Sequence, residues 1–357
     1  KNIIIDGTLS VATADAKSID KKGEEFRVNT YTNSDQYTDG HLAHPVERLS
    51  NGNIVITWRS NGQDGNSHGI YAQIFDVDGN KLGEEFRVND EPYKQQQYSS
   101  VAASENGWFV ITWMSYHQSN RWQIRAKTYN NDGTVIKSET EIYRHSSYNQ
   151  QNPQAAILEN DNIVITWESD RVPNDGNTWG VNAEIMDKDL VEVKSVFRVN
   201  KHTGNVQNVS NVTALQDGGF AVDWRSYSQA YSNKYARYLR LFDKDGIART
   251  DEILLHTYVK KNVYHGELTQ LSNGNIVAVW EQETGYEDGL GFEMDKNNYG
   301  VYGQIFDSEG NKVGGNFCLN LEYTTNHQRY PSVHSIGDNV FATAWDSYAQ
   351  DGSYEGI

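Results

Sequence analysis

Short apolar runs bounded by turn residues recur along the whole chain, and one of them repeats almost unchanged. Each copy is a run of about five residues that ends in tryptophan, at Trp58, Trp113, Trp167, Trp224, Trp280 and Trp345. The intervals between these tryptophans are 55, 54, 57, 56 and 65 residues. Self-similarity at a nearly fixed period is typical of repeat proteins, so the sequence predicts six copies of one structural unit.

The pattern within each copy predicts four β-strands. In the first copy, an apolar segment at 45–49 precedes an Asn-Gly pair at 51–52 and a second run at 54–58. Asn-Gly between apolar runs is a strong signal for a two-residue hairpin. Third and fourth strands follow at 69–76 and 85–89, and the fourth carries a Phe-Arg-Val-Asn motif that recurs in other copies.

The second strand of the unit is apolar on both faces. Ile54, Ile56 and Trp58 point to one side, and Val55 and Thr57 to the other. A strand of this kind is covered on both sides, as it is when sheets pack radially against two neighbours. The sequence therefore predicts an all-β fold, a six-bladed β-propeller of four-stranded antiparallel blades with the repeated tryptophans in the core.

The two ends of the chain complement each other. Residues 24–29 match the fourth strand of the unit, whereas the sixth copy reaches residue 357 where its third strand is due to begin. We expect residues 1–357 to form a single domain whose ring is closed by the N-terminal strand, with residues 1–19 as a cap or as a strand of the last blade. A chain cut within a repeat is the alternative, and seven blades remain open if the native chain is longer.

The repeat unit resembles the propeller-forming repeats of large secreted or surface proteins. The resemblance rests on Gly-Glu-Glu-Phe-Arg-Val-Asn-Thr at 23–30, Gly-Gln-Asp-Gly at 62–65 and Gly-Ile-Tyr-Ala-Gln-Ile-Phe-Asp at 69–76. Similar repeats occur in bacterial calcium-dependent toxin-repeat adhesins and in ciliate surface proteins. The resemblance implies an extracellular or cell-surface scaffold. It carries over no catalytic residues, and the calcium-binding nonapeptides of such adhesins are absent from this sequence.

Composition narrows the choice of partners. The formal net charge is −17, which disfavours nucleic acid and anionic membrane surfaces. Apolar runs are no longer than strands, so we expect no membrane insertion. The single cysteine, Cys318, excludes an intramolecular disulfide and is interpreted as an inert, partly buried thiol. The histidines show no metal-ligand spacing, and no cofactor is required by any motif.

The best candidate for a binding site is the insertion in the fifth copy, where the interval between tryptophans is longest. A long loop on a rigid scaffold is a common place for binding residues, and an aromatic ring beside carboxylates suits a sugar or a cation. The candidates are Glu283, Tyr286, Glu287, Asp288, Phe292, Glu293 and Asp295. A solvated acidic loop without a ligand is the alternative interpretation.

Three further sets of residues are candidate sites. Acidic hairpins that begin at Asp76, Asp187, Asp243 and Asp307 resemble the start of a calcium loop but lack its full set of oxygens, so a turn explains them without a metal. Asn208 and Asn211 each begin a glycosylation sequon. Irregularly placed aromatic residues are candidates for an exposed contact surface, namely Trp108, Trp122, Trp179, Tyr116, Tyr227 and Tyr231.

These observations favour a non-enzymatic extracellular module that binds a glycan or another protein through its loops. Two alternatives remain: a purely structural module of a large surface protein or filament, and a polysaccharide-degrading enzyme. Glycosidase chemistry needs two carboxylates that face each other across a bond. With 48 acidic residues, the sequence offers too many pairs to choose between.

Overall fold

The structure is a computed structural model of the 357-residue chain. It describes residues 26–39, 43–91, 95–116, 121–143, 148–170, 179–256, 261–283, 299–320 and 327–348. These residues form antiparallel β-sheets, and they contain no helix that is long and apolar enough to cross a membrane.

Six sheets follow one another along the described chain. The first consists of β1 (Gln36–Tyr37), β2 (Val46–Arg48), β3 (Ile54–Asn61), β4 (His68–Phe75) and β5 (Lys81–Arg87). The second is β6 (Gln96–Ser104), β7 (Trp108–Tyr116), β8 (Trp122–Asn130) and β9 (Val135–Ile142), and the third is β10 (Gln150–Ile157), β11 (Ile163–Ser169), β12 (Gly180–Met186) and β13 (Glu192–Arg198). The fourth is β14 (Gln207–Ala214), β15 (Phe220–Tyr227), β16 (Tyr235–Phe242) and β17 (Ile253–Leu254). The fifth is β18 (Val263–Gln270), β19 (Ile276–Glu283), β20 (Tyr299–Phe306) and β21 (Lys312–Cys318), and the sixth contains β22 (Gln328–Gly337) and β23 (Val340–Ser347).

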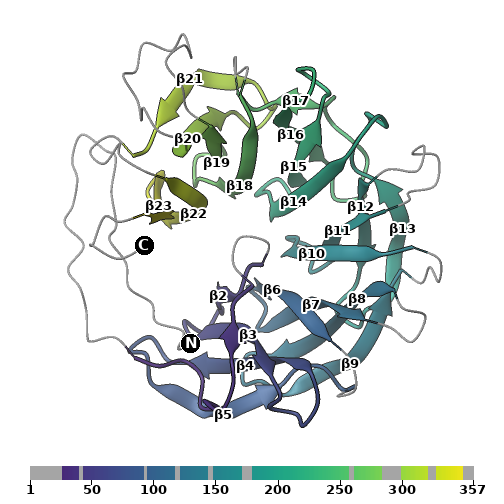
Figure 1. Ribbon diagram of the computed structural model, residues 1–357, viewed down its shortest axis with the longest axis vertical. Coiled ribbons are helices and arrows are strands. Elements are labelled where there is room, and N and C mark those ends of the chain that lie inside the picture. Colours follow the sequence, from purple (N-terminus) through teal and green to yellow (C-terminus); the bar gives the residue numbers. More distant parts are fainter. Residues whose placement is uncertain are drawn as a thin grey trace.

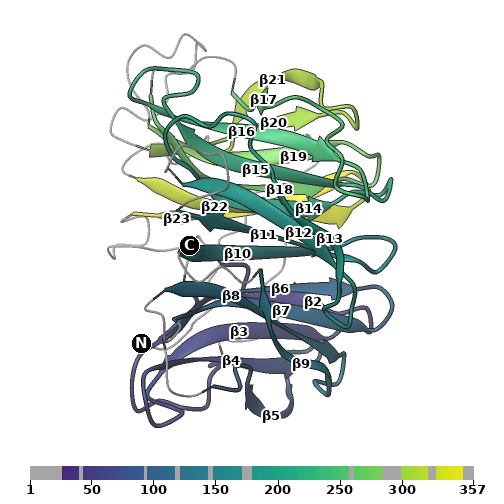
Figure 2. The same ribbon diagram turned by 90° about the vertical axis from the view of Figure 1, so that its right-hand side faces the viewer.

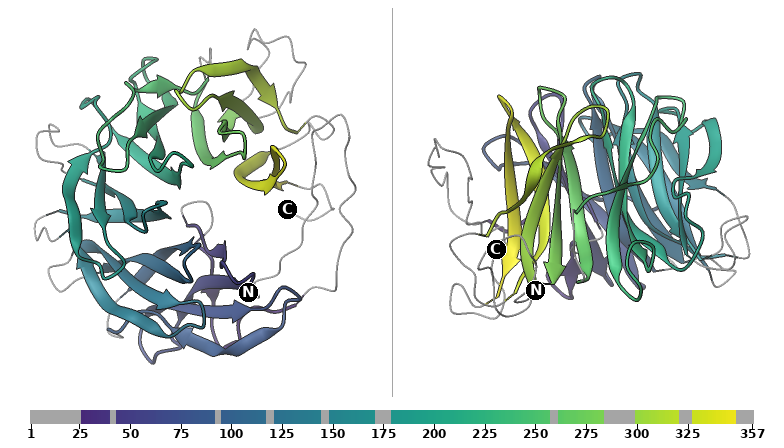
Figure 3. Two further views of the ribbon diagram at one scale, coloured as in Figure 1. Left: turned by 180° about the vertical axis from the view of Figure 1, so that it is seen from behind. Right: turned by 90° about the horizontal axis from the view of Figure 1, so that it is seen from above.

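The sheets are arranged in a ring (Figure 1). The strands nearest the axis are β2, β6, β10, β14, β18 and β22, and in the first five sheets the outermost strands are β5, β9, β13, β17 and β21. Seen from the side, the strands run roughly along the ring axis (Figure 2), and the view from behind shows the same radial order (Figure 3). The prediction of a β-propeller with four-stranded antiparallel blades is confirmed.

The repeated tryptophans lie in the core, as predicted. Trp58, Trp113, Trp167, Trp224 and Trp280 are at most 1 % exposed, whereas Trp345 is partly buried against residues of the fifth sheet. The tryptophans pack within apolar clusters that join neighbouring sheets, such as the cluster that holds Trp167 together with side chains of the second sheet. Burial of an aromatic ring of this size is a major contribution to the stability of each interface.

The recurring Phe-Arg-Val-Asn motif has a structural explanation in its asparagine. Asn200 Oδ1 accepts a hydrogen bond from the backbone N–H of Val181 in β12 (2.8 Å), and its Nδ2 donates to Gln207 Oε1 at the start of the next sheet (3.2 Å). Asn320 makes the same contacts, with Val301 N (2.9 Å) and Gln328 Oε1 (3.0 Å). The asparagine therefore joins one blade to the next through neutral hydrogen bonds, and we call this arrangement the amide clamp.

The segment before β1 contacts the first sheet as the fourth strand of a preceding blade would. Phe26 packs against Phe75 (ring centroids 5.5 Å apart), as Phe197 packs against Phe242. Asn29 Nδ2 donates to Gln36 Oε1 (2.9 Å), which reproduces the second half of the amide clamp. These contacts are what closure by the N-terminal strand requires. That closure stays a prediction, because residues 1–19 and 349–357 lie outside the described part of the chain.

The first sheet departs from the predicted four-strand unit. The sequence predicted one inner strand at 45–49, but two short strands, β1 and β2, both pair with β3. In the other sheets the inner strand continues through a β-bulge at the equivalent place, as between Gln97 and Ser100. In the first sheet, residues 38–45 separate β1 from β2 instead, and of these the structure describes 38–39 and 43–45.

Candidate active site on the ring axis

Two residues between β1 and β2, Asp39 and His44, carry side chains that contact other sheets of the ring. Asp39 forms an ion pair with Arg59 of β3 (Oδ1 to Nη2, 3.0 Å) and accepts a hydrogen bond from the backbone N–H of Tyr98 in the second sheet (2.6 Å). At the other end of the segment, His44 contacts the fourth and fifth sheets. One segment of the first sheet therefore links inner strands from three others.

The contacts of His44 fix the position of its proton. Its Nε2 lies 3.2 Å from Asn211 Oδ1 and 3.1 Å from Glu267 Oε1. Asn211 Nδ2 donates to Asp223 Oδ1 (3.3 Å), so the amide oxygen of Asn211 is the atom that faces the imidazole. Both neighbours are acceptors, and Nε2 must therefore carry a hydrogen and act as the donor.

Glu47 in β2 is a half-buried carboxyl close to this group. Burial raises its pKa to about 7, opposed by a hydrogen bond from the backbone of Arg48 and by the charge of His44, while the charges of Glu105 and then Glu267 add to the increase. Near neutral pH a large fraction of Glu47 is therefore protonated and can donate a proton. Glu267 is a second carboxyl, whose charge acts on Glu47, and it is held by His44 and by the backbone N–H of Val333 (2.7 Å).

Further carboxylates come from the residue that follows the repeated tryptophan. Glu168 of β11 is 2 % exposed and accepts a hydrogen bond from the backbone N–H of Val209 in the next sheet. Glu281 of β19 is fully buried, pairs with Arg329 Nε (3.0 Å) and accepts from the backbone N–H of Tyr330 (3.3 Å). Each of these carboxylates supports a bulge on the inner strand of the following sheet.

The supported bulges carry backbone strain. Tyr98, Val209 and Tyr330 have positive φ angles of 53°, 54° and 54°, and for β-branched Val209 this is an unfavourable conformation. The N–H of each residue is bound by a carboxylate, from Asp39, Glu168 and Glu281 respectively. In the first sheet the residue after the tryptophan is Arg59, which is not a carboxylate. Asp39 therefore binds the bulge of the second sheet in the way that Glu168 and Glu281 bind the bulges of the fourth and sixth sheets.

A fully buried ion pair lies between β15 and β16. Asp223 and Arg237 are both 0 % exposed, and Arg237 Nε donates to Asp223 Oδ2 (2.6 Å). Burial raises the pKa of Asp223 to about 6, and the guanidinium of Arg237 opposes this increase, so the carboxyl is ionised at neutral pH. Asp223 also accepts a hydrogen bond from Asn211 Nδ2. The ion pair therefore holds the side-chain amide of Asn211, whose oxygen faces His44.

The axis therefore presents a protonatable carboxyl, Glu47, and a second carboxyl, Glu267, which raises the pKa of Glu47 and whose orientation is fixed. When their surroundings give two carboxyls different pKa values, one can act as the acid and the other as the base in catalysis. Among the described residues, no group of three His, Cys, Asp or Glu side chains is arranged to hold a metal ion. The arrangement is suited to proton transfer by side chains.

The site predicted in the fifth copy falls mostly outside the described residues. Of its members only Glu283 is described, and Tyr286, Glu287, Asp288, Phe292, Glu293 and Asp295 are not. Glu283 accepts hydrogen bonds from Asn262 Nδ2 (2.8 Å) and Tyr264 Oη (2.9 Å). Burial acts to raise its pKa, but these bonds outweigh burial and hold the pKa below its ordinary value. Glu283 is thus a fixed, ionised carboxylate at the end of β19.

The structure assigns structural roles to several other predicted site residues. Asn211 is 7 % exposed and its side-chain nitrogen donates hydrogen bonds inside the fold, while Asn208 is half-buried and accepts a bond from Arg225. Trp108, expected at the surface, is 4 % exposed and belongs to the core cluster of Trp167, so that expectation is wrong. Asp76 receives bonds from the backbone of Asp78 and Asn80, which is a turn-capping role.

Sequence reasoning did not find the axial residues, although a signal was present. The residue after each repeated tryptophan is Arg59, Met114, Glu168, Arg225, Glu281 or Asp346, so this position is charged in five of the six copies. A charged residue at a fixed place beside a core tryptophan indicates a shared polar environment. His44 and Glu47, by contrast, are unremarkable in sequence, because only the ring brings them near Glu267.

Comparison with known proteins supports the fold but identifies no family. No family model matches the chain, and no curated protein matches it. Among solved structures, a protein of unknown function from Dyadobacter fermentans has 10 % identity and a TM-score of 0.55, covering 88 % of this chain and 96 % of that one. Two others are the GH93 α-L-arabinofuranosidase of Fusarium graminearum with arabinobiose (10 % identity, TM-score 0.47) and the α-L-arabinanase of Penicillium chrysogenum complexed with arabinobiose (13 %, 0.46). Both cover 72 % of this chain and 76 % of their own.

The expectation of a non-enzymatic adhesion module is therefore corrected. The two matched structures described above with a stated activity are carbohydrate-acting enzymes and not adhesins. At these identities the likeness establishes the fold, a β-propeller, and the activity has to be argued from the residues on the axis.

Proposed function

We propose that this chain is a carbohydrate-active propeller enzyme that cleaves glycosidic bonds at the axis of the ring. The observation that supports the proposal is the presence of two carboxyls in different surroundings: Glu47, whose pKa lies near 7, and Glu267, which raises that pKa and is oriented by His44. Glycosidic bond cleavage uses one carboxylic acid to protonate the leaving oxygen and a second carboxylate to act on the sugar or on a water molecule.

In the proposed reaction Glu47 is the general acid. Its protonated form donates to the glycosidic oxygen as the bond to the sugar carbon breaks. Glu267, on the other side, takes a proton from a water molecule whose oxygen forms the new bond to the sugar carbon, and the Nε2–H of His44 holds Glu267 in place. Asp223 and Arg237 act indirectly, since they fix Asn211 against His44. A polymeric substrate would be met outside the cell, and we include an extracellular location in the proposal.

The test is release of reducing sugar from a panel of neutral polysaccharides: arabinan, xylan, levan and starch. We expect one substrate to be hydrolysed, and we expect Glu47→Gln and Glu267→Gln each to lower kcat by at least about 100-fold. Glu309→Gln, in an exposed turn before β21, is the matched control and should keep full activity. If the unaltered protein hydrolyses none of the four, or if Glu47→Gln retains its rate, the proposal is wrong.

The pH profile gives an independent readout. A general acid with a pKa near 7 is active in its protonated form, so kcat should fall as the pH rises through about 7. An essential acid with an ordinary glutamate pKa would place that fall more than two units lower. A profile of that kind would exclude Glu47 from the acid role.

A further inference from the structure

The third strand of the first and fifth sheets carries a glutamine at the β-bulge that faces the outermost strand. These glutamines, Gln73 and Gln304, are fully buried. Gln73 Nε2 donates to the backbone carbonyl oxygens of Ile74 (2.9 Å), Leu82 (3.3 Å) and Gly83 (3.3 Å). Gln304 Nε2 makes the same three contacts within its own sheet. The side-chain amide therefore joins the third and fourth strands where the bulge interrupts their backbone ladder, and we call this place in the unit the bulge position.

In the third sheet the bulge position is occupied by Glu184. It pairs across the sheet with Ile165, as Gln73 pairs with Ile56, and the register with β13 shifts beside it in the same way. An ionised carboxylate has no hydrogen to donate to carbonyl oxygens, whereas a protonated carboxyl has one. The role of the glutamine is therefore open to Glu184 only in its protonated form.

The residue that follows across the bulge has also changed its charge. In the first and fifth sheets it is Lys81 or Lys312, paired with Phe75 and Phe306. In the third sheet the equivalent partner of Met186 is Glu192. Two substitutions at one bulge have thus replaced an amide and a cation by two carboxyls.

The surroundings of Glu184 favour its protonated form. Glu184 is buried, and its Oε2 has no hydrogen-bond partner among the described residues. Burial raises its pKa to about 7, and the charge of Glu192 and a hydrogen bond between the two carboxyls add to the increase. Such a bond requires one of the two to carry a proton. The other ionisable group that faces Glu184 is Tyr143 of the second sheet, and no lysine or arginine in the described part of the chain pairs with it.

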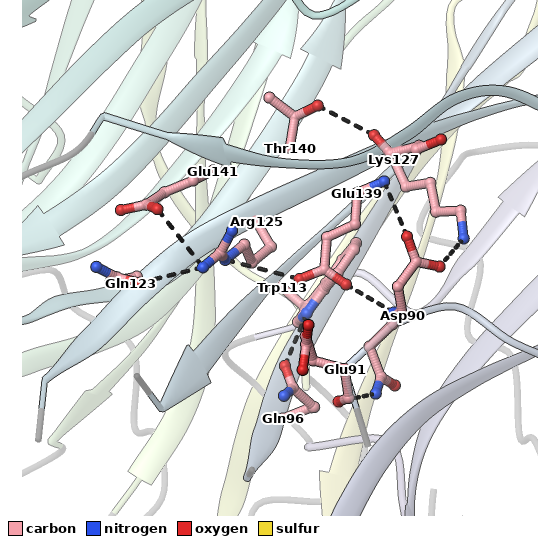
Figure 4. Close-up of polar contacts among 12 residues, drawn as sticks. Asp90, Glu91, Gln96, Trp113, Gln123, Arg125, Lys127, Glu139, Thr140 and Glu141 are labelled. Carbon is pink, nitrogen blue, oxygen red and sulfur yellow. Dashed lines mark hydrogen bonds and ion pairs between the residues drawn. The ribbon is translucent and has the colours of Figure 1, made fainter. Parts of the chain in front are cut away.

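The equivalent residues of the second and fourth sheets keep their hydrogens at neutral pH. In the second sheet Lys127 donates to the carbonyl of Val88 (3.1 Å) and pairs with Asp90 (2.7 Å), as Figure 4 shows for the ion pair. In the fourth sheet Arg240 donates to the carbonyl of Val199 (2.8 Å). Of the five sheets with a described third strand, the third is therefore the one whose bulge position gains or loses its donor within the range of pH 5 to 8.

We propose that Glu184 and Glu192 form a proton-operated latch on the outermost strand of the third sheet. When one proton is held between the two carboxyls, β13 is joined to β12 at the bulge. When both are ionised, the carboxylates repel each other and β13 separates more readily from β12. The latch lies on the outer side of the ring and does not depend on the proposed activity at the axis.

The direction of the pH effect follows from the raised pKa of Glu184. A carboxyl whose pKa is raised by folding from 4.5 to about 7 gives stability that is fully present below the lower value and is lost as the pH rises through the higher one. Protection of β13 should therefore be high in mildly acidic solution and should fall through about pH 7.

Hydrogen exchange of the backbone amides tests the latch. Protection factors of β13, corrected for the intrinsic effect of pH on exchange, are measured at pH 5.5 and pH 8.5, with β21 of the same protein as the internal reference. We expect protection of β13 relative to β21 to fall at least about tenfold between the two pH values. An unchanged ratio would overturn the proposal.

Two variants restore what other copies have at this place. Glu184→Gln supplies the amide of Gln73 and Gln304, and Glu192→Lys supplies the cation of Lys81 and Lys312, which lowers the pKa of Glu184. In both variants the protection ratio should change by less than about twofold between pH 5.5 and pH 8.5. Exposed Glu159→Gln is the control and should retain the full loss. If either restoring variant loses protection as the unaltered protein does, the two carboxyls are not the latch.

The readout also separates this proposal from the one at the axis. Glu47→Gln removes the proposed general acid and should leave the pH dependence of β13 unchanged. Loss of that dependence in Glu47→Gln would place its origin at the axis and contradict the latch.

Discussion

The ring axis and the outer junctions between sheets join neighbouring blades in chemically different ways. At the junctions, the amide clamp uses neutral side chains that recur from the Phe-Arg-Val-Asn motif, as in Asn200 and Asn320. At the axis, carboxylates such as Glu168 and Glu281 bind backbone N–H groups of the next sheet, and their identity differs from copy to copy. Neutral clamps provide a stability that does not depend on pH. Titratable carboxylates make the protonation of the inner surface depend on pH, and groups of this kind can take part in catalysis.

The largest effect is expected from breaking the buried ion pair. Arg237→Ala leaves Asp223 buried without its counter-ion, and should lower the free energy of unfolding by about 3–5 kcal/mol. The third copy has Thr166 and Val181 at the equivalent positions. The double change Asp223→Thr with Arg237→Val should therefore cost much less than the single one. Urea unfolding measures both, with exposed Arg87→Ala as the control. Equal costs for the single and double changes would contradict the idea that the ion pair stands in for the Thr166 and Val181 of the third copy.

A core tryptophan tests the apolar part of the junctions. Trp167 is fully buried among side chains of two sheets, and Trp167→Ala should destabilise the fold by about 3–5 kcal/mol at every pH. The loss should be the same at pH 5 and pH 8.5, because no titratable group is removed. A loss that depends strongly on pH in urea titrations would mean that the apolar junction and the charged axis are not independent.

Glu168 tests the titratable part. Burial raises its pKa from 4.5 to about 7, opposed by the hydrogen bond from Val209. A raised carboxyl pKa gives stability that is fully present below the unfolded pKa and is lost as the pH rises through about 7. Glu168→Gln keeps an acceptor for Val209 but has no charge to bury, so its stability relative to the unaltered protein should increase between pH 5 and pH 8.5, by at most about 3 kcal/mol. Exposed Glu159→Gln serves as the control, and parallel pH curves for all three proteins would refute the argument.

The amide clamp gives the smallest expected effect. Asn200→Ala removes the acceptor of Val181 N and the donor to Gln207, which should cost about 1–3 kcal/mol, again without dependence on pH. Exposed Asn66→Ala should change the stability by no more than about 0.5 kcal/mol. If Asn200→Ala is as neutral as this control, the motif has a role other than joining blades.

The sequence by itself determined the repeat, the strand order within it and the burial of the tryptophans. These follow from local alternation and from turn residues such as Asn51-Gly52, which act over a few positions of the chain. The amide clamp was visible as a motif, but its partner Gln207 belongs to the next copy, so its role could not be read from one unit.

Only the tertiary structure decided which charged residues meet. His44 and Glu267 are separated by more than half of the chain, and they lie 3.1 Å apart because the ring returns its first sheet opposite its fifth. The splitting of the first inner strand, which delivers Asp39 and His44 to the axis, was likewise missed, since an insertion between two short strands has no periodic signature. Periodicity records what is repeated at short range, whereas the candidate site is made of the residues by which the copies differ, brought together across the axis.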